Sequence, residues 1–260
     1  MIELEGVTKY YANASTPAVA EISLMVESGS LHVLLGESGS GKTTVLKMIN
    51  RLVEMSSGRI RLDGEDIRAI DPIALRRRIG YAFQGVGLFP HMTVAENIAV
   101  VPRLLGWPGR AVSDRIDELL ETIGLAPASF RDRYPRELSG GQRQRVGVAR
   151  ALAARSQILL MDEPFGALDP ITRDELQEEL KKLHRSLGLT VVLVTHDVNE
   201  ALLLADRIAV MKDGCLLGHD TPDRLLNAPP HPYVETLMAM PKRQAAKLAE
   251  LASNRVTGVS

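Results

Sequence analysis

Apolar and polar residues alternate over Ile2–Val7 and Ala20–Val26, and this period of two predicts two short β-strands near the N-terminus. Three later runs are apolar almost throughout, namely Leu31–Leu35, Ile158–Met161 and Thr190–Thr195. Such runs indicate strands that are buried on both faces of a sheet. The pattern therefore predicts an α/β fold, with a mostly parallel sheet at its centre and an antiparallel β lobe formed by the N-terminal strands.

A helical spacing of apolar residues dominates the middle of the chain. It is clearest at Val112–Ile123 and returns at Arg143–Ala154. We therefore expect an α-helical subdomain, over about residues 85–154, inserted into the α/β domain. That whole domain is expected to span residues 1–240, and residues 241–260 are expected to form a short helix and a frayed end.

Composition narrows the class of protein. The 260 residues are 45% hydrophobic and 24% charged, as in an ordinary globular protein, and the net charge of −1 gives no reason to expect a nucleic-acid surface. The single cysteine, Cys215, excludes an internal disulfide and a thiolate zinc cluster. No apolar run approaches the roughly 18 residues that span a bilayer, and no signal-peptide pattern begins the chain. We expect a cytosolic chain that reaches a membrane only through a partner.

A glycine-rich loop lies between the Leu31–Leu35 strand and a helical pattern at Val45–Leu52. It matches the phosphate-binding template G-x-x-x-x-G-K-[ST]. The template predicts that the Lys42 ammonium reaches the β- and γ-phosphates and that the Thr43 hydroxyl binds Mg²⁺. A plain turn before a helix is the alternative, but Lys-Thr directly after the last glycine argues against it. The expected phosphate-binding residues are Gly36, Glu37, Ser38, Gly39, Ser40, Gly41, Lys42, Thr43 and Thr44.

A second anion-binding helix start is predicted at Ser139–Gln142. Ser139 is a favourable N-cap, and Gly140 and Gly141 leave backbone N–H groups accessible at the positive end of the helix dipole, ahead of Gln142. An ordinary capped helix is the alternative, and it would not need both glycines.

Polar residues also follow two of the buried strands. Asp162 and Glu163 come directly after the Ile158–Met161 run, and His196 follows Thr190–Thr195. A carboxylate at a strand end can hold Mg²⁺ through water, while a neighbouring carboxylate polarises an attacking water. Since neighbours in a strand point to opposite faces, we expect the two acids to have different roles. Ligands bind at the carboxyl ends of parallel strands, which favours a role for His196 in binding. A single histidine is more often structural, and this is the alternative.

In this order and at these distances, the motifs resemble those of the nucleotide-binding subunit of ATP-binding cassette (ABC) transporters, over about residues 1–240. The resemblance implies that Glu163 is the general base and that His196 contacts the γ-phosphate. It assigns Gln84 to Mg²⁺ and the lytic water. It also implies that Tyr11 stacks on adenine, whereas the local sequence alone leaves core capping open as well.

The resemblance further implies how subunits assemble. The phosphate loop of one subunit and the Ser139–Gln142 segment of another sandwich each ATP, so a homodimer closes on two nucleotides with Mg²⁺. Ala167-Leu168-Asp169 matches the loop that crosses to the other subunit and includes the nucleotide-site residue Asp169; Gly166 stands where a serine is usual. Integral-membrane permease subunits and a periplasmic or extracellular substrate-binding protein complete such complexes. Phe83–Thr93 is expected near the permease, which places the chain at the inner face of the membrane.

A narrower similarity concerns the substrate. Gly87–Pro102, Lys47–Leu52 and Asp162–Pro170 resemble the ATPases of osmoprotectant importers, which take up glycine betaine, choline and related quaternary amines. Many of those ATPases carry a C-terminal pair of regulatory domains, and we expect no sensing through such a pair here because this sequence ends before it. Importers of other small solutes, such as amino acids or other amines, are the alternative.

Two other classes of ABC protein are less consistent with the sequence. Soluble members in DNA repair or chromosome organisation insert a heptad segment or zinc cysteines before Leu138, and neither is present. Translation-type members carry two cassettes. A regulatory subunit that does not hydrolyse ATP would not need Glu163 and His196, so we expect an active ATPase.

Overall fold

The computed structural model describes residues 1–12, 14–83, 85 and 87–256. Its larger sheet has six strands in the order β10-β9-β3-β8-β7-β6, all parallel except for the β9–β10 hairpin. The strands are β3 (Leu31–Leu35), β6 (Ile79–Ala82), β7 (Ile158–Asp162), β8 (Thr190–Thr195), β9 (Arg207–Lys212) and β10 (Cys215–Asp220). The predicted mostly parallel sheet is therefore confirmed.

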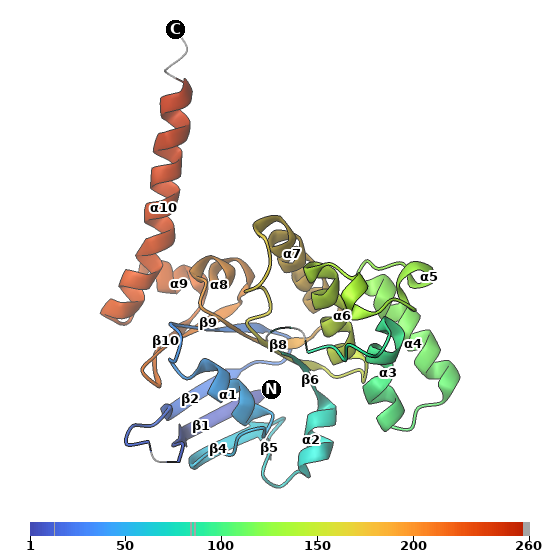
Figure 1. Cartoon of the computed structure of the whole chain (residues 1–260). Coiled ribbons are helices and arrows are strands. Elements are labelled where there is room, and N and C mark those ends of the chain that lie inside the picture. The colour runs from blue at the N-terminus through green and yellow to red at the C-terminus, as the bar shows by residue number, and fades with distance from the viewer. Residues whose placement is uncertain (13, 84, 86, 257–260) are drawn as a thin grey trace.

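The second sheet is antiparallel and forms the lobe predicted from the N-terminal alternation. Its order is β2-β1-β4-β5, and its strands are β1 (Ile2–Lys9), β2 (Val19–Val26), β4 (Ser57–Leu62) and β5 (Glu65–Asp66). Helix α1 (Lys42–Ile49) lies between the two sheets and buries Val45, Leu46 and Met48 there (Figure 1). The helix that follows the phosphate loop is thus fixed from both sides.

The apolar character of the central strands follows from this layering. In β8, Val192 and Val194 belong to the core shared with α1 and the β lobe, whereas Val191 and Leu193 belong to the core under the helices of the other face. Alternate residues of a strand point to opposite faces, so a strand covered on both faces needs apolar residues throughout.

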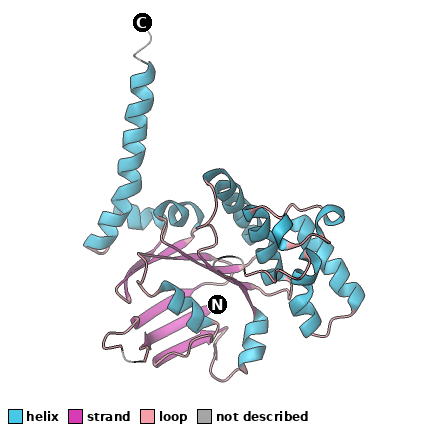
Figure 2. Cartoon of the chain, viewed as in Figure 1, coloured by secondary structure: helices cyan, strands magenta, loops and turns pink. Residues whose placement is uncertain are grey.

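The chain between β6 and β7 forms a group of helices, which lies at one side of the molecule (Figure 2). They are α3 (Val94–Leu104), α4 (Gly109–Thr122), α5 (Pro127–Phe130) and α6 (Gly140–Leu152), with a 3₁₀ turn at Pro135–Glu137. The apolar face of α4 is buried through Ile116, Leu119 and Leu120. Helix α2 (Pro72–Arg78) precedes β6, while α7 (Pro170–Leu187), α8 (Val198–Leu204) and α9 (Pro222–Asn227) follow β7, β8 and β10.

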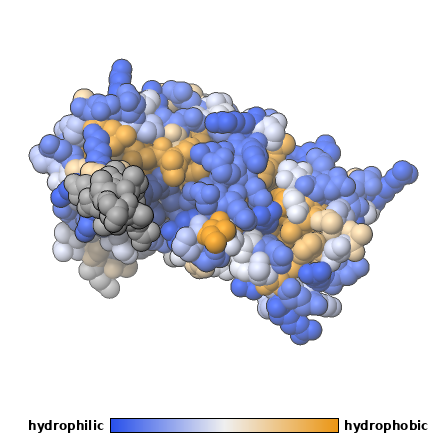
Figure 3. All heavy atoms as spheres, turned by 90° about the horizontal axis from the view of Figure 1, so that it is seen from above, coloured by the Kyte–Doolittle hydropathy of each residue, from blue (hydrophilic) through white to orange (hydrophobic). Residues whose placement is uncertain are grey.

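The C-terminal helix α10 (Pro232–Val256) differs from the expected short tail. It begins nine residues before Pro241, which lies inside it, and it projects away from the body of the molecule (Figure 1). The face of the molecule from which α10 projects is mainly hydrophilic, with separate apolar areas (Figure 3). The helix starts early because Val234 and Met238 are buried in the core. Among the described helices, none combines the length and the apolar composition that a membrane span requires.

His32 is a buried polar residue in the middle of β3. It is fully shielded from solvent, and both of its ring nitrogens lack a hydrogen-bond partner among the described residues. Its ring lies 5.4 Å from that of His219 on β10. Burial, helped by the charges of His219 and Arg207, lowers the pKa of His32 from 6.5 to about 4. The folded state therefore holds this imidazole neutral where the unfolded chain would protonate it.

This pKa shift predicts how stability depends on pH. Because the folded-state pKa is the lower one, the free energy of unfolding should fall as the pH drops from about 6.5 to about 4, by at most about 3 kcal/mol from this residue. His32→Leu removes the titrating group without removing a hydrogen bond. Urea titrations across this pH range should therefore show that the free energy of unfolding of the variant falls less steeply with acid than that of the parent. His91→Gln, at an exposed histidine, is the control, and an unchanged slope in His32→Leu would contradict the assignment.

Candidate nucleotide-binding site

The phosphate loop is held by backbone contacts that only glycine permits. A Cβ atom at Gly36 would lie 2.2 Å from the carbonyl oxygen of Met211, and one at Gly41 would lie 2.4 Å from that of Ala18. Gly41 also has a φ of 98°, in the left-handed region. The loop therefore fits closely between the end of β9 and the start of β2.

Lys42 occupies the interior of the loop. Its side chain is buried, and Nζ donates hydrogen bonds to the carbonyl oxygens of Gly36 (2.8 Å) and Glu37 (2.7 Å) and to Oγ of Ser40 (3.3 Å). Burial lowers the pKa of Lys42, while the nearby carboxylates of Glu163, Asp162 and Glu37 act in the opposite direction. The ammonium is thus fixed at the point where α1 begins and the helix dipole is positive.

Thr43 and Asp162 meet beside this lysine, as the sequence predicts for a metal site. The hydroxyl Oγ1 of Thr43 donates to Oδ1 of Asp162 at 2.8 Å. Hydroxyl and carboxylate oxygens are the hard ligands that Mg²⁺ prefers. Gln84, which the resemblance also assigns to Mg²⁺ and the lytic water, lies outside the described residues.

Glu163 and His196 are brought together by the ends of two neighbouring strands. His196 Nδ1 lies 3.4 Å from Glu163 Oε1. Glu163 follows β7 with a φ of 45°, so it has left the strand, and its N–H donates to the carbonyl of Val194. Asp162 and Glu163 have different partners, Thr43 and His196, and their different roles stay a prediction. The two side chains diverge because Glu163 has a left-handed backbone conformation, and not because neighbours alternate along a strand. Such a conformation is costly for a residue other than glycine and is frequent at functional sites.

Lys42, Thr43, Glu163 and His196 line one cleft of about 640 Å³, within the range of small-molecule sites. Its walls are the loop from Gly36 to Thr44 together with Glu163 and His196, and Leu237 of α10 closes one side. Tyr11 lies next to the loop, with its hydroxyl 3.3 Å from Oγ1 of Thr44. Tyr11 is 44% exposed, which argues against core capping, and Lys9 Nζ lies 5.3 Å from the centroid of its ring.

The Ser139–Gln142 segment does not reach this cleft within one chain. Ser139 caps α6 reciprocally with Gln142, at 3.2 Å and 3.0 Å, so the predicted N-cap is confirmed. Gly140 borders a separate hollow of about 350 Å³, on the far side of Glu163 and His196. A Cβ at Gly141 would lie 2.4 Å from Thr172 Cγ2, so this glycine already has a packing role within the monomer.

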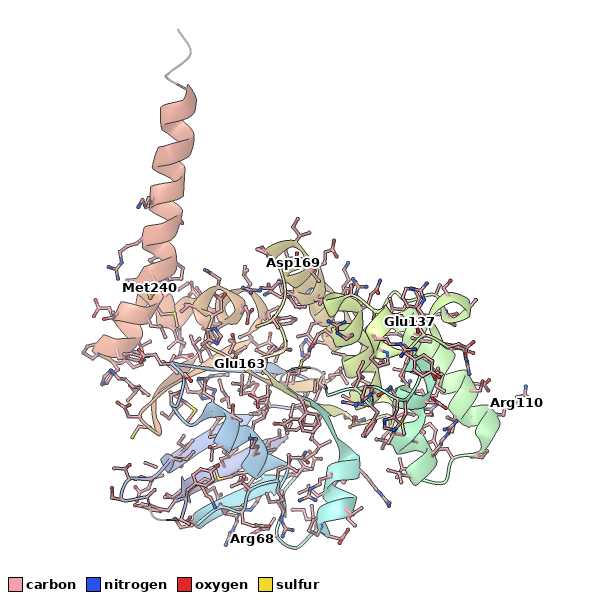
Figure 4. All side chains as sticks on the ribbon, viewed as in Figure 1. Arg68, Arg110, Glu137, Glu163, Asp169 and Met240 are labelled. Atoms are coloured by element: carbon pink, nitrogen blue, oxygen red, sulfur yellow. The ribbon has the colours of Figure 1, made fainter. Side chains whose placement is uncertain are left out.

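Asp169 also lies away from the phosphate loop, at the start of α7 (Figure 4). Its carboxylate accepts a hydrogen bond from the N–H of Thr172 at 3.0 Å. Hydrogen bonding with the Thr172 side chain, and next with this N–H, lowers the pKa of Asp169. Within one chain Asp169 is therefore a helix cap. The structure thus assembles the loop residues, Asp162, Glu163 and His196, but neither Ser139–Gln142 nor Asp169.

Tyr233 on α10 contacts a residue of the cleft wall, and the sequence pattern did not predict this contact. Its hydroxyl donates to Oε1 of Glu37 at 3.0 Å, across 196 positions of sequence. Burial, together with this bond, raises the pKa of Tyr233 to about 12, so it stays a donor at physiological pH. No local pattern signals the contact, because only the packing of α10 creates it.

The fold and the cleft together define a nucleotide-binding cassette. The family model for ABC transporters matches residues 19–166, and the chain belongs to this family. The structure superposes on a dimeric structure of the bacterial ABC transporter cassette MJ0796 with a TM-score of 0.76 and 36% identity, over 85% of this chain and 99% of that one. The same cassette in a post-hydrolysis state bound to ADP and Pi gives a TM-score of 0.75 and 35% identity, with the same coverage.

Curated relatives are more similar in sequence. The chain is 54% identical to the glycine betaine/carnitine/choline transport ATP-binding protein OpuCA of Bacillus subtilis, over 90% of this chain and 61% of that one. It is also 54% identical to the glycine betaine uptake system ATP-binding protein YehX of Escherichia coli, over 90% and 75% of the two chains. It thus spans about three fifths of the length of OpuCA.

The two glycines at the start of α6 should respond differently to alanine. Gly141→Ala forces a Cβ against Thr172 and should lower the free energy of unfolding by about 1–3 kcal/mol. In Gly140→Ala the added Cβ makes only an ordinary contact, 3.6 Å from Leu168. This variant should change the free energy of unfolding by less than about 0.5 kcal/mol. Urea denaturation of both variants tests this; equal losses would show that the α6–α7 contact is not close.

Proposed function

We propose that the chain is the ATP-hydrolysing subunit of an ABC importer that takes up an osmoprotectant through a separate permease. The observation that carries this proposal is the cleft lined by Lys42, Thr43, Glu163 and His196, with Asp162 hydrogen-bonded to Thr43. A phosphate loop, a pair of oxygen ligands and a carboxylate–histidine pair at one sheet edge are what phosphoryl transfer to water requires.

Each group has a definite task in this proposal. The loop amides and Lys42 bind the phosphates, and Tyr11 stacks on adenine. Bound Mg²⁺ would supply charge neutralisation between the phosphates, held by Thr43 and Asp162 with Gln84 as a further ligand. Glu163 orients and deprotonates the attacking water, while His196 contacts the γ-phosphate and, through its 3.4 Å contact, holds Glu163 in place.

A second copy of the chain completes each site. Ser139–Gln142 and Asp169 lie outside the phosphate-loop cleft of their own chain, which supports their use by the partner's nucleotide. Two copies related by a twofold axis would each supply a phosphate loop and a helix start to two shared ATP molecules. The dimeric structure of the similar MJ0796 cassette supports this arrangement.

An apolar hollow provides the contact to the permease. It has a volume of about 330 Å³ and lies between the lobe and the helices, where Phe83, Phe89 and Leu52 are each at least 40% exposed. A short amphipathic helix at the cytoplasmic side of a permease would bury these side chains. The chain would then be peripheral at the inner face of the membrane, in a complex that also contains a substrate-binding protein.

The substrate is proposed from the relatives. OpuCA and YehX are named for transport of glycine betaine, and OpuCA also for carnitine and choline. We propose a quaternary amine of this class. A similar chain, 44% identical, is named as a spermidine/putrescine import ATP-binding protein, so another small amine is the alternative.

Glu163→Gln keeps the size of the side chain but removes the base. ATP hydrolysis by the purified protein, measured as phosphate release, should fall by roughly 10²–10⁴-fold, while ATP binding should persist. Glu178→Gln, at an exposed α7 residue paired with Lys181, is the matched control and should hydrolyse ATP at the parent rate. Parent-like turnover in Glu163→Gln would remove Glu163 from its proposed role.

The permease contact is tested separately from hydrolysis. Phe89→Asp puts a charge into the apolar hollow and should abolish uptake of labelled glycine betaine at high osmolarity, in cells lacking their own uptake system but carrying the cognate permease. Hydrolysis by the isolated variant should stay within about threefold of the parent. Normal uptake by Phe89→Asp would place the permease elsewhere, and an inability of the parent to support uptake of any quaternary amine would redirect the search to other solutes.

A further inference from the structure

The first turns of α10 carry two adjacent rows of side chains with different surroundings. Val234 and Met238 are buried in the core, at 0% and 2% exposure. Tyr233 and Leu237 precede them by one residue and contact the nucleotide cleft, Tyr233 through Glu37 and Leu237 as part of the wall. Residues four apart share a helix face. The core row therefore fixes the helix so that its neighbouring row lies against the phosphate loop.

The hydroxyl of Tyr233 is linked to Lys42 through a single residue. It donates to the Glu37 carboxylate at 3.0 Å, and the backbone carbonyl of Glu37 accepts a hydrogen bond from Lys42 Nζ at 2.7 Å. Glu37 is therefore held by α10 at its side chain and by the lysine at its backbone. A movement of α10 would change the position of the carbonyl that orients the ammonium.

The ring of Tyr233 also contacts the hairpin on which the loop rests. Lys212 Nζ, at the end of β9, lies 4.4 Å from the ring centroid. In the turn that follows, the N–H of Gly214 donates to the carbonyl of Ser40 at 3.3 Å. Tyr233 is thus in contact with one end of the phosphate loop directly and with the other end through this turn.

We propose that Tyr233 is a positioning residue of the nucleotide site, and that its hydroxyl, acting through Glu37, couples the docking of α10 to occupancy of the phosphate loop. The inference rests on the proposed function, since it requires that the loop bind a nucleotide. Coupling between two equilibria is reciprocal. The hydroxyl should strengthen nucleotide binding, and nucleotide should in turn strengthen the docking of α10.

The first test is affinity for Mg–ADP, measured by isothermal titration calorimetry so that hydrolysis does not interfere. Tyr233→Phe deletes one oxygen atom and keeps the ring, so the thermal midpoint without nucleotide should stay within about 2 °C of the parent. The dissociation constant should rise about 3–10-fold, as expected for one hydrogen bond to a charged acceptor at a partly exposed site. Tyr134→Phe, at an exposed tyrosine before α6, is the matched control and should not change it.

A double-mutant cycle separates action through Glu37 from simple packing. Glu37→Gln retains a side-chain oxygen that can accept the hydroxyl, so Tyr233→Phe should still weaken binding in that background. Glu37→Ala removes the acceptor, so Tyr233→Phe should add nothing there. An equal effect of Tyr233→Phe in the parent and in Glu37→Ala would overturn the proposal.

Hydrogen exchange tests the reciprocal effect. In the parent, Mg–ADP should slow amide exchange over residues 232–240 by about the same factor by which Tyr233→Phe weakens binding, and in Tyr233→Phe this protection should disappear. Unchanged affinity and unchanged protection in Tyr233→Phe would overturn the coupling while leaving the proposed function intact. Failure of the parent to bind any nucleotide would overturn both.

Discussion

The phosphate loop depends on backbone contacts that are too close for any side chain. Gly36 and Gly41 lie directly against the carbonyls of Met211 and Ala18, and this fit holds the loop in the shape that encloses Lys42. The two contacts come from β9 and from the segment before β2, so the shape of the loop depends on both sheets. A binding site built in this way requires little rearrangement of the protein when a ligand arrives, which is how preorganisation increases affinity.

The same constraint explains why α1 lies where it does. The helix starts at Lys42 and is packed between the two sheets, so its positive end is fixed beside Asp162 and Thr43. Neighbouring strand ends then add Glu163 and His196 to the same edge. The N–H of Glu163 donates a hydrogen bond to the carbonyl of Val194 in the neighbouring strand. This bond helps to hold Glu163 in its strained left-handed conformation.

The chain keeps apart two sets of groups that we propose to bind the same kind of ligand. One set surrounds the phosphate-loop cleft, and the other comprises Ser139–Gln142 and Asp169, whose side chains cap helices within their own chain. These caps hold Ser139, Gln142 and Asp169 through hydrogen bonds within their own chain. The arrangement suits an enzyme whose complete site forms only between two copies, since neither set has to reorganise when they meet.

The sequence by itself determined the layered fold and most of the cleft. Apolar runs such as Thr190–Thr195 predict strands covered on both faces, and Gly36–Thr44, Asp162, Glu163 and His196 stand at the ends of such strands, where parallel pairing brings them together. These signals are local, so they can be recognised from the sequence without the structure. Tertiary structure decided what depends on distant packing: the length of α10, the unpaired burial of His32, the packing role of Gly141, and the bond from Tyr233 to Glu37. The physical reason is that a residue's local pattern specifies its own element, whereas these contacts arise only when separate elements pack against one another.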